Sequence, residues 1–215
     1  MTGIYALPGT GPRPALQMAS GAVIDIAQPD PQSIHIEDLG HSLAYICRFG
    51  GHVQKFYSVA QHSINVASIA MELAREAHAG ESDEQIERVM IRYRLYGLLH
   101  DASEGILGCD IPTPLKRFPG LESFAKIQDI HMAAIATRFD ISAGFDKDPI
   151  LKRADVIAFA VEARDLMGDP EWARVEIGRR DAQPQIVPLG PDMARVAYLQ
   201  EVNEALSARR YVEMR

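Results

Sequence analysis

Apolar residues recur at helical spacing through most of the chain after residue 35, which predicts a mainly α-helical protein. The clearest example begins at Ser58, where Gln61 three residues later completes a capping-box pattern for a helix start. One face of this predicted helix carries Val59, His62, Val66, Ile69 and Leu73. Because such an apolar face packs against the core, we expect the side chain of His62 to point inward.

Further capping and turn residues set the limits of the other predicted helices. Ser82 with Gln85 repeats the capping pattern, and Asp148 followed by Pro149 suits a helix start with proline in the first turn. Gly168 is expected to end the helix that begins at Pro149. Besides the helix that begins at Ser58, the sequence predicts helices over residues 36–49, about 86–104, about 121–139, 149–167 and about 192–209.

The N-terminal part of the chain differs from the rest. Residues 1–35 are rich in glycine, proline and alanine, and residues 21–30 alternate well enough to predict a short strand or hairpin arm. Residues 184–190 are expected to form a short strand that pairs with this arm, and three prolines in residues 109–120 predict a loop. No internal repeat divides the chain, so we expect one globular domain, with the arm at 1–35 and a helical part at 36–215.

Composition limits the classes of function. The 215 residues are 47% hydrophobic and 24% charged, which suits one sizeable core and argues against disorder. The net charge of -7 argues against a binder of nucleic-acid polymers. Two cysteines, Cys47 and Cys109, favour reduced thiols over disulfides, and no cysteine-centred motif supports Cys109 as a nucleophile. No apolar run approaches the roughly 20 residues of a membrane span and no signal peptide is indicated, so we expect a cytoplasmic protein.

The dipeptide His100-Asp101 closes the helix predicted over about 86–104, and Gly105 supplies the expected stop. His62 precedes this dipeptide in the sequence and Asp155 follows it, both in mostly apolar helical segments. Burying two imidazoles and two carboxylates without a partner is costly, whereas together they suit a metal ion. The expected cofactor is one divalent transition metal per chain, Co, Mn, Fe, Ni or Zn, with Mg as a further candidate.

This pattern resembles the ligand signature of the HD-domain metal-dependent phosphohydrolases. The nucleotide-hydrolysing branch of that family, which includes bacterial 5'-deoxynucleotidases and related phage-type enzymes, is similar to the segments ICRFGGHVQKFYSVAQHS, LLHDASEGILGCDIPTPLKRF and LKRADVIAFAVEARDLM. The resemblance covers residues 37–167. It implies a single HD-domain helical bundle with a short N-terminal hairpin or arm, and metal ligation by His62, His100, Asp101 and Asp155.

The resemblance also implies roles for residues around the metal. Glu104, one helical turn after Asp101, is expected to act with it in catalysis by positioning or deprotonating the attacking water. Arg48 is expected to bind phosphate through its guanidinium group, the alternative being a surface salt bridge. Phe49 stands where this branch usually places a tryptophan against the sugar. Further candidate substrate contacts are His52, Lys55 and Lys116.

Asp110 leaves two interpretations open. It matches an acid that recognises the sugar hydroxyl in the related nucleotidases, but the segment between Glu104 and Asp110 is one residue longer than in their pattern. The Asp110 carboxylate could instead cap the loop that follows.

Together these features predict a phosphohydrolase that releases phosphate from 2'-deoxyribonucleoside 5'-monophosphates, with a nucleotide and no nucleic-acid polymer as its partner. Extra cations at His52, Lys55, Lys116 and Arg117 leave a deoxynucleoside triphosphate triphosphohydrolase as an alternative. An alternative of another class is a non-catalytic metal- or nucleotide-binding module, against which the presence of Glu104 argues. The remaining histidines show no pattern for a second metal, and the resemblance favours a homodimer.

Overall fold

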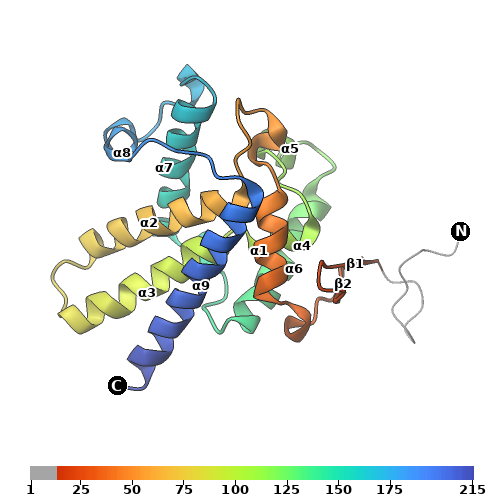
Figure 1. Ribbon diagram of the computed structural model, residues 1–215, viewed down its shortest axis with the longest axis horizontal. Helices are drawn as coiled ribbons and strands as arrows, with labels where there is room; N and C mark the ends of the chain where they lie inside the picture. The colour runs from red at the N-terminus through yellow and green to blue at the C-terminus, as the bar shows by residue number, and fades with distance from the viewer. Residues whose placement is uncertain (1–13) are drawn as a thin grey trace, which may run out of the picture.

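The computed structural model of the protein describes residues 14–215, most of which lie in α-helices (Figure 1). The expected mainly α class is confirmed. In chain order the helices are α1 (Ile36–Tyr45), α2 (Val59–Ala77), α3 (Asp83–Leu99), α4 (Ala102–Leu107), α5 (Thr113–Lys116), α6 (Glu122–Arg138), α7 (Pro149–Leu166), α8 (Ile177–Ala182) and α9 (Pro191–Glu213). Short 3-10 turns are η1 (Pro31–Ser33), η2 (Arg48–Gly51), η3 (Phe145–Lys147) and η4 (Glu171–Ala173).

A short antiparallel hairpin precedes the helices, as the sequence predicts. Strands β1 (Ala15–Gln17) and β2 (Val23–Asp25) pair so that Leu16 faces Ile24. The backbone N–H and the hydroxyl of Ser20, in the turn, donate to the Asp38 carboxylate of α1 at 2.8 and 2.7 Å. These bonds fix the hairpin against the helical part. Residues 1–13 of the expected arm lie outside the described residues.

Helices α2 and α3 lie side by side in direct backbone contact (Figure 1). The apolar face predicted for α2 is buried, and His62 on it is 0% exposed. Gly97 of α3 makes the close approach possible, because a Cβ atom at this position would lie 2.3 Å from the Cα atom of Ala67 in α2. The distance between these two helices is therefore set by a residue without a side chain.

The predicted caps hold in the structure. The Ser58 hydroxyl accepts the N–H of Gln61, but the Gln61 side chain bonds Val187 and Leu189 rather than the backbone of Ser58, so only half of this predicted capping box forms. Ser82 and Gln85 form the full reciprocal capping box, and Asp148 caps α7. Gly168, with φ 78°, follows the end of α7 as expected. Helix α9 extends past its expected end near residue 209, and α8 is a helix that the sequence pattern does not predict. No helix in residues 14–215 combines the length and apolar character that a membrane crossing needs.

Helix α1 ends before the expected residue 49. Ile46 is extended because its carbonyl accepts the N–H of Val59 at 3.1 Å, while the N–H of Arg48 donates to the Tyr57 carbonyl at 2.9 Å. This pairing competes successfully with continued helix formation. It also places Arg48 next to the N-terminus of α2.

The prediction of one continuous helix through His100 and Asp101 is wrong. The backbone leaves the helical conformation at Asp101 (φ -107°, ψ 15°), so α3 and α4 are separate helices. Gly105 is not the stop but lies inside α4, where an added Cβ would lie 3.0 Å from a side-chain carbon of Leu43 in α1. The helix stops instead at Gly108, in a left-handed conformation. In an unbroken helix the side chains of His100 and Asp101 would point about 100° apart around the helix axis.

Two further expectations are wrong. The predicted loop over residues 109–120 contains the short helix α5, because a proline in the first helical turn requires no N–H donor. Residues 184–190 form no strand. The Asp165 carboxylate accepts one N–H of this segment and the Gln61 amide bonds two further backbone groups, so side chains of α7 and α2 fix its course.

Candidate metal centre

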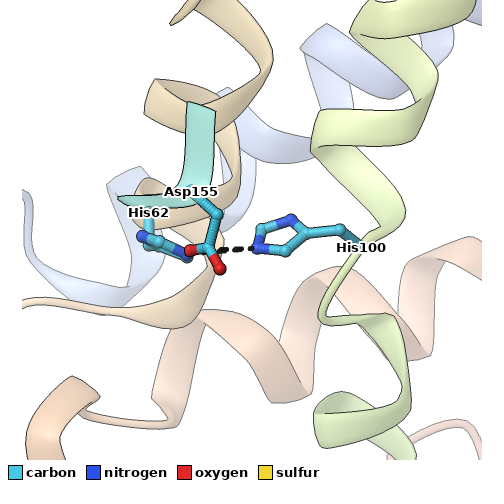
Figure 2. A group of neighbouring side chains, drawn as sticks. All are labelled: His62, His100 and Asp155. Atoms are coloured by element: carbon cyan, nitrogen blue, oxygen red, sulfur yellow. Dashed lines mark hydrogen bonds and ion pairs between the residues drawn. The ribbon is translucent and has the colours of Figure 1, made fainter. Parts of the chain in front are cut away.

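The four predicted metal ligands converge from three parts of the fold. His62 comes from α2, His100 and Asp101 from the junction of α3 and α4, and Asp155 from α7. The two imidazole Nε2 atoms lie 3.2 Å apart, His62 Nε2 lies 3.3 Å from Asp155 Oδ1, and His100 Nε2 lies 3.2 Å from Asp101 Oδ2. Figure 2 shows both rings and the Asp155 carboxylate pointing toward one another. We call these four residues the His/Asp cluster.

Each imidazole of the cluster has its second nitrogen engaged outside it. His100 Nδ1 lies 2.8 Å from the Gly97 carbonyl, and because a carbonyl only accepts, Nδ1 carries the proton. His62 Nδ1 lies 2.5 Å from Glu162 Oε1. In neutral rings with Nδ1 donating, both Nε2 lone pairs face the cluster. Such acceptors of Nδ1 protons commonly orient histidines that bind metals.

The cluster needs positive charge at its centre. Burial and the Arg48 guanidinium lower the pKa of His62, but the Glu162 and Asp155 carboxylates more than offset this and raise it to about 10. Burial raises the pKa of Asp155, whereas His62 and His100 lower it, to about 2. The ligand atoms of His62, His100 and Asp155 lie within 4.8 Å of one another, so one ion can satisfy all three. This mixed nitrogen and oxygen donor set fits the predicted divalent metal.

Glu162 is a site residue that lies outside the sequence motifs described above. It is 0% exposed, and besides His62 it accepts from Arg48 Nε and Nη2, each at 3.3 Å from its Oε2. The sequence contains a signal for it. Glu162 follows Asp155 by seven residues in an apolar helix, and this spacing places both on one helix face.

Arg48 lies buried among carboxylates rather than on the surface. It is 8% exposed, and its Nη1 lies 3.5 Å from Asp101 Oδ2 and 3.7 Å from Asp110 Oδ2, in addition to the bonds with Glu162. The surface salt bridge considered for this residue is therefore wrong. The guanidinium stands between a cluster carboxylate and two further acids, so it supplies positive charge at the edge of the cluster.

Asp110 and Phe49 lie together beside Arg48. The Asp110 carboxylate accepts the backbone N–H of Phe49 at 3.3 Å. Phe49 has φ 58° and ψ 25°, a left-handed conformation that is uncommon for a bulky residue. The one-residue extension before Asp110 thus does not remove it from the site, and its carboxylate holds the turn at Phe49.

Glu104 is buried next to the cluster and pairs with a lysine. It is 2% exposed, and its Oε1 accepts from Lys116 Nζ at 3.1 Å. Burial raises the pKa of Glu104 well above its usual range, and the charges of Asp101 and Asp110 add to this effect, whereas Lys116 lowers it. Within residues 14–215, Glu104 Oε2 has no hydrogen-bond partner. The side chain therefore has a free acceptor close to the predicted metal.

The other candidate residues are less closely connected to the cluster. His52 and Lys55 are exposed in the segment after η2, and no hydrogen bond or ion pair ties their side chains to other described residues. Cys109 is a free, partly buried thiol, and burial raises its pKa, which is the opposite of what activates a nucleophilic cysteine.

Comparison with known proteins gives relatives without an assigned activity. No protein-family model matches the chain. It is 33% identical over 204 residues to the uncharacterized protein RCAP_rcc00048 of Rhodobacter capsulatus, covering 93% of this chain and 95% of that protein. It is 30% identical over 179 residues to the uncharacterized protein YfdR of Escherichia coli K12, covering 82% of this chain and 87% of that protein.

Proposed function

The chain belongs to the family of RCAP_rcc00048 and YfdR, and we propose that it is a metal-dependent phosphohydrolase of nucleotides. One observation carries the proposal: two imidazoles, each with Nδ1 engaged elsewhere, bring their Nε2 atoms within 3.2 Å of one another beside two aspartates. The choice of a phosphohydrolase reaction rests on the resemblance of the surrounding segments to HD-domain nucleotidases.

His62, His100, Asp101 and Asp155 would hold the metal, which supplies activation of water and neutralises phosphoryl oxygens. In the proposed reaction a water oxygen attacks phosphorus, the bond from phosphorus to the 5' oxygen of the sugar breaks, and that oxygen takes up a proton. Glu104 accepts the proton of the attacking water through its unpartnered Oε2. Its raised pKa makes it a better proton acceptor than a solvent-exposed carboxylate.

The cations beside the cluster bind the phosphate group in this proposal. Arg48 already neutralises acids on three sides, and a phosphate that enters can replace part of its contact with Asp101 or Asp110. Lys116 holds Glu104 in place and adds positive charge. In this proposal Asp110 and Phe49, which both lie beside Arg48, contact the sugar of the nucleotide.

We propose a 2'-deoxyribonucleoside 5'-monophosphate as the substrate and the cytoplasm as the compartment. The rival substrate is a deoxynucleoside triphosphate, cleaved to nucleoside and tripolyphosphate. Lys116 Nζ is paired with Glu104 Oε1 at 3.1 Å rather than free for a more distant phosphate, and this contact favours the monophosphate.

The test is an assay of the purified protein on a panel of deoxynucleoside mono- and triphosphates, with metal content measured on the same sample. We expect about one divalent ion per chain, release of inorganic phosphate from monophosphates, and loss of activity on chelation. Asp155→Ala should abolish activity while circular dichroism stays helical.

Other outcomes would overturn parts of the proposal. Faster release of tripolyphosphate from triphosphates, most weakened by Lys116→Ala, would establish the rival substrate. Metal binding without hydrolysis of any panel member would favour the non-catalytic binding module. A protein that holds no divalent metal and keeps its activity with chelator would contradict the mechanism.

A further inference from the structure

Three aromatic side chains form a row that begins beside the His/Asp cluster and ends in solvent. Phe49 comes from η2, Phe159 from α7 and Trp172 from η4. The ring centroids of Phe49 and Phe159 lie 5.9 Å apart, and those of Phe159 and Trp172 are also 5.9 Å apart. We call these three residues the aromatic row.

Two rings of the row, Phe159 and Phe49, lie close to the cluster. Phe159 follows Asp155 by four residues in α7 and therefore lies one turn away on the same helix face. Phe49 follows Arg48, whose guanidinium carbon lies 5.4 Å from the centre of the Phe49 ring. Arg48 in turn lies 3.5 Å from Asp101. A molecule with its phosphate at the cluster would extend along these rings.

The row is not part of the hydrophobic core formed by the described residues. Phe49 and Phe159 are partly buried, and Trp172 is 65% exposed. Phe49 also keeps a left-handed backbone conformation, φ 58°, which is unfavourable for its bulky side chain and which the Asp110 carboxylate holds in place. Strain of this kind is concentrated where a side chain must be presented to a ligand. The row is thus better explained by binding than by folding.

We propose that Phe159 and Trp172, the outer part of the aromatic row, bind the base of the nucleotide, an inference that rests on the proposed function of the cluster. Every nucleobase has a π-face, so stacking on aromatic rings accepts all bases. The row therefore selects nucleotides over sugar phosphates that lack a base, and it does not select among the bases.

Trp172 is the only tryptophan of the sequence, so its fluorescence reports on the row directly. The wild-type protein, as purified, is mixed rapidly with 2'-deoxyadenosine 5'-monophosphate, and emission is followed before turnover. We expect saturable quenching. The matched probe 2-deoxyribose 5-phosphate, which has the same phosphate and sugar but no base, should leave the emission unchanged.

Substitutions test the same inference through kinetics. Phe159→Ala and Trp172→Ala should each raise KM for the nucleotide roughly 5- to 100-fold, as expected for the loss of base stacking, with a smaller effect on kcat. Trp172→Phe keeps a ring and should stay close to wild type. Tyr211→Ala removes another exposed aromatic, at the far end of α9, and should have no effect.

The outcomes separate this inference from the proposed function. If the nucleotide quenches the fluorescence but the protein hydrolyses no nucleotide, base binding by the aromatic row is supported and the proposed enzymatic function is overturned. If the protein hydrolyses nucleotides, but they do not quench its fluorescence and both alanine variants keep the wild-type KM, the proposed enzymatic function is supported. Base binding by the aromatic row is then overturned. Equal quenching by the sugar phosphate would also contradict base stacking. Because Trp172 is exposed, its alanine variant tests the row even if Phe159→Ala fails to fold.

Discussion

Glu162 Oε1 and His62 Nδ1 lie 2.5 Å apart in the interior, where both residues are 0% exposed. The same carboxylate receives the Arg48 guanidinium on its other oxygen. Glu162 therefore fixes the ring of a predicted metal ligand and the position of the predicted phosphate-binding group at once. A change at this residue should affect the metal and the substrate together.

The first prediction concerns Glu162→Gln. Glutamine can still accept the Nδ1 proton of His62, but it lacks the charge that makes this histidine a stronger ligand. We expect metal affinity to fall by roughly 10- to 100-fold, the usual effect of losing a residue that orients a metal-binding histidine. Competition with a chelator of known affinity measures it. Glu201→Gln, which weakens a contact with Arg94 elsewhere, is the matched control. Unchanged metal affinity in Glu162→Gln would contradict a role of Glu162 in metal binding.

The second prediction concerns Glu104→Gln. If this carboxylate accepts the proton of the attacking water, turnover should fall on the order of 10²–10⁴. Metal content should stay near that of the wild type, because the four cluster residues are unchanged. The measurement is kcat on a deoxynucleoside monophosphate alongside metal analysis of the same sample. Loss of the metal from this variant would indicate that Glu104 is a metal ligand rather than the proton acceptor.

The third prediction concerns the spacing of α2 and α3. Gly97→Ala places a Cβ atom 2.3 Å from the Ala67 backbone, so the two helices must separate. Overpacking usually costs about 1–3 kcal/mol of unfolding free energy, and contact with backbone makes the upper end the expectation here. Metal affinity should fall as well, because His62 and His100 come from these helices. Urea unfolding and chelator competition measure the two effects. Gly178→Ala in α8, where an added Cβ meets nothing within 4 Å, should leave metal affinity unchanged and should not lower the unfolding free energy, because alanine favours a helix more than glycine does.

The fourth prediction concerns pH and His131 of α6, which is 0% exposed and donates from Nε2 to the Ile26 carbonyl at 3.1 Å. Burial lowers the pKa of His131 below its ordinary value of 6.5, although the Ile26 bond and the Asp25 charge act in the other direction. Below that value the unfolded chain binds a proton that the folded chain resists. The unfolding free energy should therefore decrease as the pH is lowered, by up to about 1.4 kcal/mol per pH unit from this group.

His131→Gln keeps a donor for Ile26 and removes the titration. Urea unfolding of both proteins between about pH 7.5 and pH 5 should show a steeper loss of stability in the wild type. Parallel profiles would show that His131 titrates alike in the folded and unfolded chains.

Much of the fold follows from local sequence signals. The start of α2 at Ser58 and the start of α7 at Asp148 are encoded by side chains that bond their own first turn, and such bonds depend on neighbours in sequence. The inward direction of His62 likewise follows from helical periodicity. The convergence of the four cluster residues agrees with what the family resemblance implies, and their role as metal ligands stays a prediction.

The errors arise where distant residues decide the local structure. Helix α1 stops early because Ile46 bonds to Val59, and residues 184–190 take their course from Gln61 and Asp165. Glu162 falls outside any short motif because its partners, His62 and Arg48, are about 100 residues away. The spacing of seven residues from Asp155 places Glu162 on the same face of α7, but nothing within this helix identifies His62 and Arg48 as its partners.

The break at Asp101 divides the chemistry between two rigid pieces of backbone. His100 is the C-cap residue of α3 and Glu104 lies in α4, and Asp101 is the junction between the two helices. A small rotation about this joint would carry Glu104 and the Asp101 carboxylate together, while His100 stays in register with His62 through the packing of α3 on α2. If Glu104 is the proposed proton acceptor and the cluster holds the proposed metal, such a rotation changes the distance between them while the histidines stay in place. The position of α4 is then the first feature to compare between the protein with and without a bound nucleotide.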